Sequence, residues 1–199
     1  MFNGSLTHFL ENIYGKDQAV FEYQKKRYEK LIEEHVSIFG KNKLYLFSSP
    51  GRTEISGNHT DHNNGKVLAA AINLDTITAV SASGTPHVKL LSNGYKKPFD
   101  VNLSHLEAVE NEKQTTNALI RGVAARFKAL GYKTGGFNAR LTSEVLPGSG
   151  LSSSASIEIL IASVFNELFN DGKISAMEMA KIGQFSEINY FGKPCGLMD

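Results

Sequence analysis

The spacing of apolar residues along the chain predicts amphipathic helices. Near the N-terminus, apolar side chains recur every three or four positions, and Gly40 follows the last of them as a helix cap. These side chains are Tyr28, Leu31, Ile32, Val36 and Phe39. Residues 116–130 carry a second apolar stripe at helical spacing. Ser175 and Glu178 have the spacing of a capping box, which predicts that a further helix begins there.

Alternating or β-branched segments predict strands between these helices. The strands are expected at residues 44–48, 74–81, 87–92, 97–103 and 136–142. Asn93-Gly94 is a turn dipeptide, so the third and fourth segments are expected to form a hairpin. No internal repeat interrupts the pattern. The sequence therefore predicts one unit that mixes helices and strands.

Composition narrows the class of protein. The chain has 199 residues, 41% of them hydrophobic, so it can bury a core of one domain or slightly more. The formal net charge is +1, which favours neither nucleic acid nor a membrane surface as partner and leaves a small molecule. Cys195 is the single cysteine, and we see no signal peptide or membrane span in the sequence. We expect a cytoplasmic protein, and the chain end at Asp199 suggests a truncated chain.

The stretch from Ser48 to Asp75 is the first candidate for a functional site. It places an arginine, two histidines and an aspartate among small polar residues, before an abrupt apolar run. Binding groups concentrate in loops that rigid elements hold. His59 and His62 flank Asp61, which is also a spacing for metal ligands. Zinc is the less favoured interpretation, because the chain has one cysteine and no histidine-rich helix.

The second candidate is the glycine loop in residues 146–160. A strand, a Gly-rich turn and a helix expected from Ser153 to about Phe169 follow one another there, which is the arrangement of an anion site. No lysine follows the glycines, and a serine replaces the third glycine of the dinucleotide pattern, so neither common nucleotide motif fits. An ordinary serine-capped helix start is the alternative. Three consecutive serines favour phosphate binding.

Three ordered segments together resemble galactokinases of the GHMP kinase superfamily. Residues 50–68 contain Pro-Gly-Arg, Gly-x-His-Thr-Asp and Gly-x-Val-Leu; residues 148–156 read Gly-Ser-Gly-Leu-Ser-Ser-Ser-Ala-Ser; residues 192–199 read Gly-x-Pro-Cys-Gly-Leu-Met-Asp. The resemblance implies that residues 1–199 form an N-terminal GHMP kinase domain and that the family's C-terminal GHMP domain is absent. The implied fold is α+β, with a mixed sheet packed on helices, as in the ribosomal protein S5 domain 2-like fold.

The resemblance implies a sugar kinase that transfers the ATP γ-phosphate to the C1 hydroxyl of galactose. By this resemblance Asp199 is the general base, and Arg52 polarises the hydroxyl and lowers the pKa of that carboxyl group. His59 and Asp61 match residues that bind sugar hydroxyls, and Gly196 matches a backbone contact to the sugar.

ATP and Mg²⁺ are the implied cofactors. The phosphate-binding residues are expected to be Gly148, Ser149, Gly150, Leu151, Ser152, Ser153 and Ser154. Magnesium takes oxygen ligands. Ser153 and Glu187 match the family's metal-binding positions, with the neighbouring Ser154 as the alternative.

The signature departs from the family at the sugar-binding loop. The family usually reads Gly-Arg-Val-Asn-Leu-Ile-Gly-Glu-His-Thr-Asp-Tyr, whereas this chain reads Gly-Arg-Thr-Glu-Ile-Ser-Gly-Asn-His-Thr-Asp-His. Asn58 replaces a glutamate that contacts the sugar at C6, and His62 replaces a tyrosine. Because an amide both donates and accepts, a kinase for a C6-modified or other related sugar is an alternative.

A non-catalytic sensor that binds sugar and ATP is a second alternative. Loss of a Ser-Ala pair in the phosphate loop accompanies lost activity in such proteins, and Ser154-Ala155 is present here. The sugar-recognition segments argue against a homoserine or mevalonate kinase. Because the C-terminal domain is expected to complete the active-site cleft, we expect these 199 residues alone to be weakly active or inactive.

Overall fold

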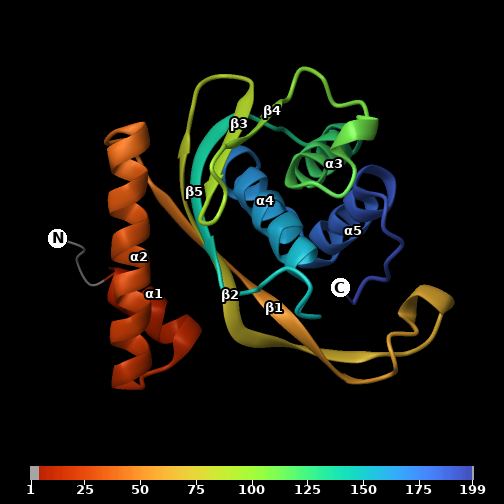
Figure 1. Cartoon of the computed structure of the whole chain (residues 1–199), viewed down its shortest axis with the longest axis horizontal. Helices are drawn as coiled ribbons and strands as arrows, with labels where there is room; N and C mark the ends of the chain where they lie inside the picture. The colour runs from red at the N-terminus through yellow and green to blue at the C-terminus, as the bar shows by residue number, and fades with distance from the viewer. Residues whose placement is uncertain (1–4, 199) are drawn as a thin grey trace. The chain divides into compact units, whose positions relative to one another are not determined.

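The computed structural model describes residues 5–198, and the chain divides into two compact units (Figure 1). The first unit ends at Asn42 and the second begins at Lys43. The first unit consists of two helices, α1 (Ser5–Tyr14) and α2 (Gln18–Phe39).

Both ends of α2 are capped by the residues that flank it. The side chain of Asp17 accepts a hydrogen bond of 3.0 Å from the Val20 N–H, which satisfies a donor of the first turn. Gly40 has a φ of 82°, and its N–H donates to the Val36 carbonyl. The helix and the glycine cap that the sequence predicts are therefore confirmed.

The second unit is built on a five-stranded mixed sheet. The strand order is β1-β2-β5-β3-β4; β3 and β5 are parallel and every other neighbouring pair is antiparallel. The strands are β1 (Tyr45–Ser56), β2 (Leu68–Ala82), β3 (His87–Ser92), β4 (Phe99–Asn102) and β5 (Phe137–Ser143). Every predicted strand is present. The mixed sheet confirms the expected α+β fold class.

The first two strands are longer than the sequence predicts. The polar stretch that begins at Ser48 was expected to be a loop, but β1 continues through it and pairs with β2. Register shifts between Pro50 and Arg52 and between Glu54 and Ser56 mark irregularities in this pairing. Such bulges re-aim side chains while keeping the strands paired. The loop between the strands is therefore confined to residues 57–67.

Three helices lie on one side of this sheet, as Figure 1 shows; two of them contact strands, and the third packs on these two helices. They are α3 (Thr116–Ala129), α4 (Ser153–Phe169) and α5 (Ala176–Ser186), and a π-helical turn (Glu187–Phe191) follows α5. The core between the sheet and the helices includes Val80, Leu90, Ile120, Phe127, Phe137 and Phe165. This packing fixes the N-terminal end of α4 beside β1, which brings the two candidate sites together.

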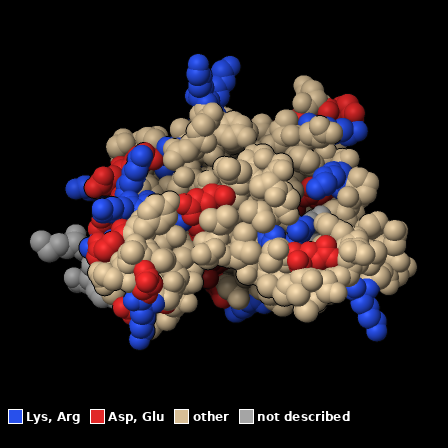
Figure 2. All heavy atoms as spheres, turned by 60° about the horizontal axis from the view of Figure 1, so that its bottom comes forward, with Lys and Arg blue, Asp and Glu red and all other residues tan. Residues whose placement is uncertain are grey.

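The surface carries charges of both signs. On the face drawn in Figure 2, lysine and arginine side chains are interspersed with aspartate and glutamate. This distribution agrees with the small net charge of the sequence. Among the helices of residues 5–198, none has the length and apolar character required to cross a membrane.

Candidate functional site

Arg52 on β1 is the centre of the site. Its Nη1 donates to the Gly150 carbonyl at 3.2 Å, and its Nε donates to the Met198 carbonyl at 3.3 Å. Its Nη2 lies 3.3 Å from Nε2 of His59. Burial lowers the pKa of Arg52, while the carboxylates of Glu54 and Asp61 oppose that shift. One guanidinium group thus links the strand, the glycine loop and the C-terminal segment.

The contact with Arg52 determines the tautomer of His59. An arginine can only donate hydrogen bonds, so Nε2 of His59 must be the acceptor. The proton of the neutral ring is then on Nδ1, which lies 3.6 Å from Oδ1 of Asp61. The ring is therefore held between a cation and a carboxylate, with each of its nitrogens directed at one of them.

Asp61 joins the loop to the C-terminal segment. Its Oδ2 accepts a hydrogen bond of 2.9 Å from the Met198 N–H. Although burial alone raises the pKa of Asp61, this bond and the nearby His59 ring hold it below its usual value. A Cβ atom added to Gly196 would lie 1.7 Å from the same oxygen, so a glycine is required for this approach. Oδ1 of Asp61 is buried, faces Nδ1 of His59 at 3.6 Å and makes no hydrogen bond of normal length within residues 5–198.

His59, Asp61 and His62 also have ligand atoms within 4.8 Å of one another. A metal bound at Nδ1 of His59 would require the proton on Nε2, where it would face the Arg52 guanidinium. Two donors would then oppose each other. This arrangement therefore favours a hydrogen-bonded cluster over a metal site.

The glycine loop precedes the N-terminal end of α4. Gly148, Gly150 and Ser152 all have φ between 60° and 76°, a region that glycine enters without steric cost. Arg52 also donates its backbone N–H to the Leu151 carbonyl at 3.1 Å. A Cβ atom at Gly51 would lie 2.9 Å from that carbonyl, so β1 and the loop approach closely. The loop is thus fixed against β1 and leads into the first turn of α4, where backbone N–H groups are available to an anion.

Ser154 makes the contact with Glu187. Its hydroxyl donates a hydrogen bond of 2.9 Å to the Glu187 carboxylate, which is almost completely buried. The sequence assigned this position to Ser153, with Ser154 as the neighbour. Successive side chains on a helix point about 100° apart, so only one of the two serines faces the glutamate. Nζ of Lys193 lies 3.8 Å from the same carboxylate and partly balances its charge.

A second glutamate lies behind Glu187. Glu158 on α4 is 2% exposed, and burial together with the Glu187 charge raises its pKa to about 10. At neutral pH Glu158 is therefore protonated and neutral. Burial also raises the pKa of the Cys195 thiol, to about 12, which removes it as a nucleophile at neutral pH.

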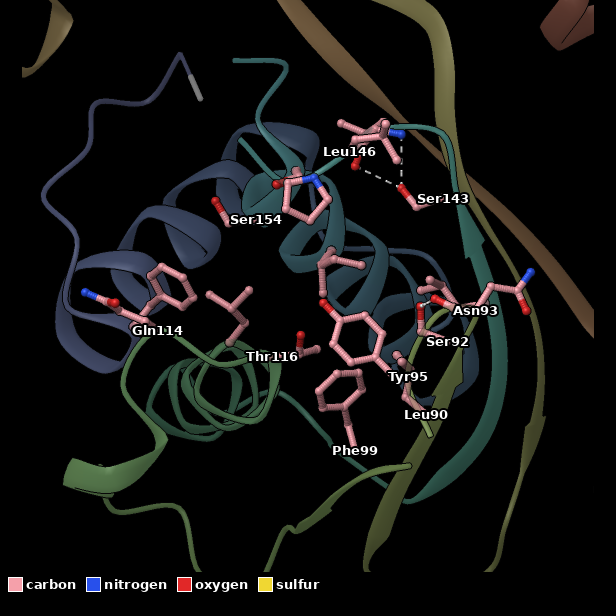
Figure 3. A pocket seen from close by; sticks show the side chains of 17 residues that line it. Leu90, Ser92, Asn93, Tyr95, Phe99, Gln114, Thr116, Ser143, Leu146 and Ser154 are labelled. Atoms are coloured by element: carbon pink, nitrogen blue, oxygen red, sulfur yellow. Dashed lines mark hydrogen bonds between the residues drawn. The ribbon is translucent and has the colours of Figure 1, made fainter. Parts of the chain in front are cut away.

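A cavity of about 260 Å³ lies beside the two serines (Figure 3). Ser153 and Ser154 form one part of its wall, and Leu146 and Pro147 contribute from the glycine loop. Figure 3 shows Tyr95 and Phe99 next to each other, below Ser154. Their ring centroids are 5.0 Å apart. The cavity therefore combines hydroxyl groups at one end with aromatic faces at the other.

The structure brings most of the sequence-predicted residues into one region. Arg52, His59, Asp61 and Gly196 converge as described above. Asn58, the second residue of the loop, is exposed and has a left-handed backbone with φ 52°. Asp199, the predicted base, lies outside the described residues, directly after Met198.

Sequence reasoning missed two acidic residues of this region. Glu158 lies in the otherwise apolar run Ile-Glu-Ile-Leu-Ile, and a charged residue in such a run is a signal that could have been used. Glu54 lies two residues after Arg52 on β1 and accepts a hydrogen bond of 3.0 Å from the His59 N–H. It was hidden because this part of β1 was interpreted as a loop.

Two protein-family models match different parts of the chain. The galactokinase galactose-binding signature matches residues 33–82, and the GHMP kinase N-terminal domain matches residues 118–199. Galactokinase of Clostridium tetani is 36% identical over 169 residues, which cover 85% of this chain and 43% of that protein. Galactokinase of Bacillus subtilis is 33% identical over 166 residues, which cover 82% of this chain and 42% of that protein. The chain thus spans less than half the length of these relatives.

Solved structures give the same result. The crystal structure of Lactococcus lactis galactokinase complexed with galactose superimposes with a TM-score of 0.80 and 29% identity, over 87% of this chain and 45% of that protein. The crystal structure of Methanococcus jannaschii mevalonate kinase superimposes with a TM-score of 0.61 and 19% identity, over 79% of this chain and 51% of that protein. This similarity shows a shared fold.

Proposed function

We propose that this chain, which belongs to the galactokinase family of GHMP kinases, supplies the sugar-binding and phosphate-binding half of an ATP-dependent sugar kinase. The reaction is transfer of the ATP γ-phosphate to the C1 hydroxyl of galactose or a close relative. One observation carries the proposal. Arg52 contacts both the glycine loop at Gly150 and the C-terminal segment at Met198, so the phosphate-binding and sugar-binding segments meet at one cation.

The sugar is assigned to the loop after β1 and the C-terminal segment. The Asp61 carboxylate can accept a sugar hydroxyl, and its charge strengthens that hydrogen bond. His59 lies beside it, and Gly196 allows the backbone to approach without a side chain. Asn58 in the same loop can donate as well as accept, so C6-modified sugars belong among the candidate substrates.

ATP is assigned to the glycine loop and the adjoining cavity. The backbone N–H groups at the start of α4 suit the phosphates, because the positive end of the helix dipole lies there. The aromatic side chains Tyr95 and Phe99 can pack on the base, while the serines face the phosphates. Phosphoryl transfer depends mainly on such positioning and on neutralising charge.

Glu187 and Ser154 would hold the Mg²⁺ that accompanies ATP. A carboxylate and a hydroxyl are hard oxygen ligands, and Glu187 is almost completely buried next to the Ser154 hydroxyl. When bound, Mg²⁺ would neutralise charge on the transferring phosphate. Ser154 in the first turn of α4 and Glu187 after α5 would hold it.

The remaining step is removal of the C1 proton, which we assign to Asp199. The Met198 N–H is bonded to Asp61 and the Met198 carbonyl to Arg52, so the residue preceding Asp199 is held on both sides. A guanidinium beside a carboxylate keeps it ionised and so able to accept a proton. Given this chemistry and the single, poorly ionised cysteine, we assign the protein to the cytoplasm.

An ADP-release assay with Mg-ATP tests the proposal on the protein expressed from its natural gene. Galactose, N-acetylgalactosamine, galacturonate and arabinose would be compared. Turnover on galactose or on one relative is expected. Binding of sugar without ADP release would support the sensor alternative instead, and no binding of any of the four sugars would contradict the assignment of the loop.

A further inference from the structure

We infer that Glu54 is a positioning residue of the sugar-binding loop: its carboxylate holds the backbone of His59, so that the His59 ring and Asp61 face the ligand. The inference rests on the proposed function, because it concerns the loop assigned to the sugar. It adds a residue that lies on β1, outside the loop itself.

The loop needs such support because its backbone is strained. Gly57, Asn58 and His59 have φ values of 121°, 52° and 55°, three consecutive residues in the left-handed half of the map. Asparagine tolerates this region better than most residues, but histidine adopts it at a cost in free energy. Without a partner, His59 would relax toward negative φ and turn its ring away. An interaction at its backbone is therefore required to keep the observed geometry.

Glu54 supplies that interaction. Its Oε1 accepts a hydrogen bond of 3.0 Å from the His59 N–H. A carboxylate acceptor makes this bond stronger than one to a neutral group. The bond reaches His59, the last residue of the left-handed run that begins at Gly57. The loop conformation is thus fixed from β1, a strand paired along its length with β2.

Glu54 and Arg52 hold the same histidine from different directions. The two residues are separated by one position on β1, so their side chains leave the same face of the strand. Arg52 donates to the His59 ring, while Glu54 accepts from the His59 backbone. The Glu54 charge also opposes the effect of burial on the pKa of Arg52. The negatively charged Glu54 therefore holds the backbone of His59, and the positively charged Arg52 holds its ring.

The sequence supports the same assignment. Glu54 lies on β1, and Asn58 is the second residue of the loop that follows it. Asparagine suits the left-handed backbone at position 58, and the charge lies at position 54, where it can hold His59.

Two substitutions and a control test the inference. Glu54→Ala removes the acceptor, while Glu54→Gln keeps an oxygen acceptor without the charge. The control is Glu167→Ala, which removes an exposed glutamate in the last turn of α4, about 20 Å along the helix from its start. Thermal unfolding would establish that each variant is folded.

The first readout is hydrogen exchange of the His59 amide by NMR in the sugar-free protein. This measurement requires neither sugar binding nor turnover, so it tests the hydrogen bond between Glu54 and the His59 N–H even if the proposed function fails. We expect exchange to accelerate about tenfold or more in Glu54→Ala, less in Glu54→Gln, and not at all in the control. Unchanged exchange in a folded Glu54→Ala variant would overturn the inference.

The second readout separates sugar from nucleotide. We expect the KM for galactose to rise about tenfold in Glu54→Ala, with a KM for ATP close to that of the unmodified protein. Substantial recovery in Glu54→Gln would show that the acceptor matters more than the charge. If the His59 amide exchanged faster in Glu54→Ala while the KM for galactose stayed unchanged, the assignment of Glu54 to sugar positioning would also be overturned.

Discussion

The hydroxyl of Ser154 donates a hydrogen bond of 2.9 Å to Glu187, which lies 33 residues later in the chain. Ser154 belongs to the first turn of α4, and Glu187 begins the turn that follows α5. The bond therefore connects the glycine loop to the end of another helix. The Ser154 hydroxyl and the Glu187 carboxylate both offer oxygen atoms, the ligand type that Mg²⁺ takes.

The first prediction concerns which serine supports magnesium. Ser154→Ala is expected to raise the Mg²⁺ concentration for half-maximal activity about tenfold or more, because it removes the hydroxyl that faces Glu187. Ser153→Ala is the matched control, since it removes the same group one position earlier. Its effect on the Mg²⁺ requirement is expected to be smaller. If Ser153→Ala had the larger effect in Mg²⁺ titrations, Ser153 would be the magnesium ligand, as the sequence suggested.

The second prediction concerns the close approach at Gly196. In Gly196→Ala the added methyl group would meet Oδ2 of Asp61 at 1.7 Å, so either the carboxylate or the segment must move. We expect kcat/KM for the sugar to fall about a hundredfold. Gly183→Ala is the control, because its nearest neighbour would be 3.4 Å away, an ordinary contact. Steady-state kinetics of both variants measure this fall. Equal losses of kcat/KM in Gly196→Ala and Gly183→Ala would contradict the special role of Gly196.

The third prediction concerns the pH dependence of stability. Burial and the neighbouring Glu187 raise the pKa of Glu158 from 4.5 to about 10, so the folded protein keeps this proton where the unfolded chain releases it. The contribution to stability is therefore complete below about pH 4.5 and is lost as pH rises toward about 10. Glu158→Gln has no proton to lose there. Its stability relative to the unmodified protein should rise between pH 5 and pH 9.

Urea unfolding at several pH values measures this difference. Glu167→Gln, which changes an exposed glutamate of the same helix, is the control and should show no such trend. A constant difference between Glu158→Gln and the unmodified protein across this range would show that Glu158 is ionised in the folded state.

The order of the three motifs along the chain was enough to predict the family and the mixed sheet, and several of the residues that it named lie close together in the structure. The glycine loop and the helix from Ser153 are where the sequence placed them, because local backbone requirements determine both. Ser154 could not be separated from Ser153, because which serine faces Glu187 depends on the rotation of α4 against α5. Glu54 was missed for a related reason. Its role depends on the pairing of β1 with β2, and the polar residues of β1 resemble a loop.

The central claim is that this chain takes part in phosphorylating a sugar at C1. The most direct test is phosphorus NMR of the product formed from galactose and Mg-ATP by the protein expressed from its natural gene. We predict a sugar phosphate whose phosphorus couples to the anomeric proton, formed in equal amount to ADP. ADP release without a sugar phosphate, or a phosphate coupled to another position, would contradict the account.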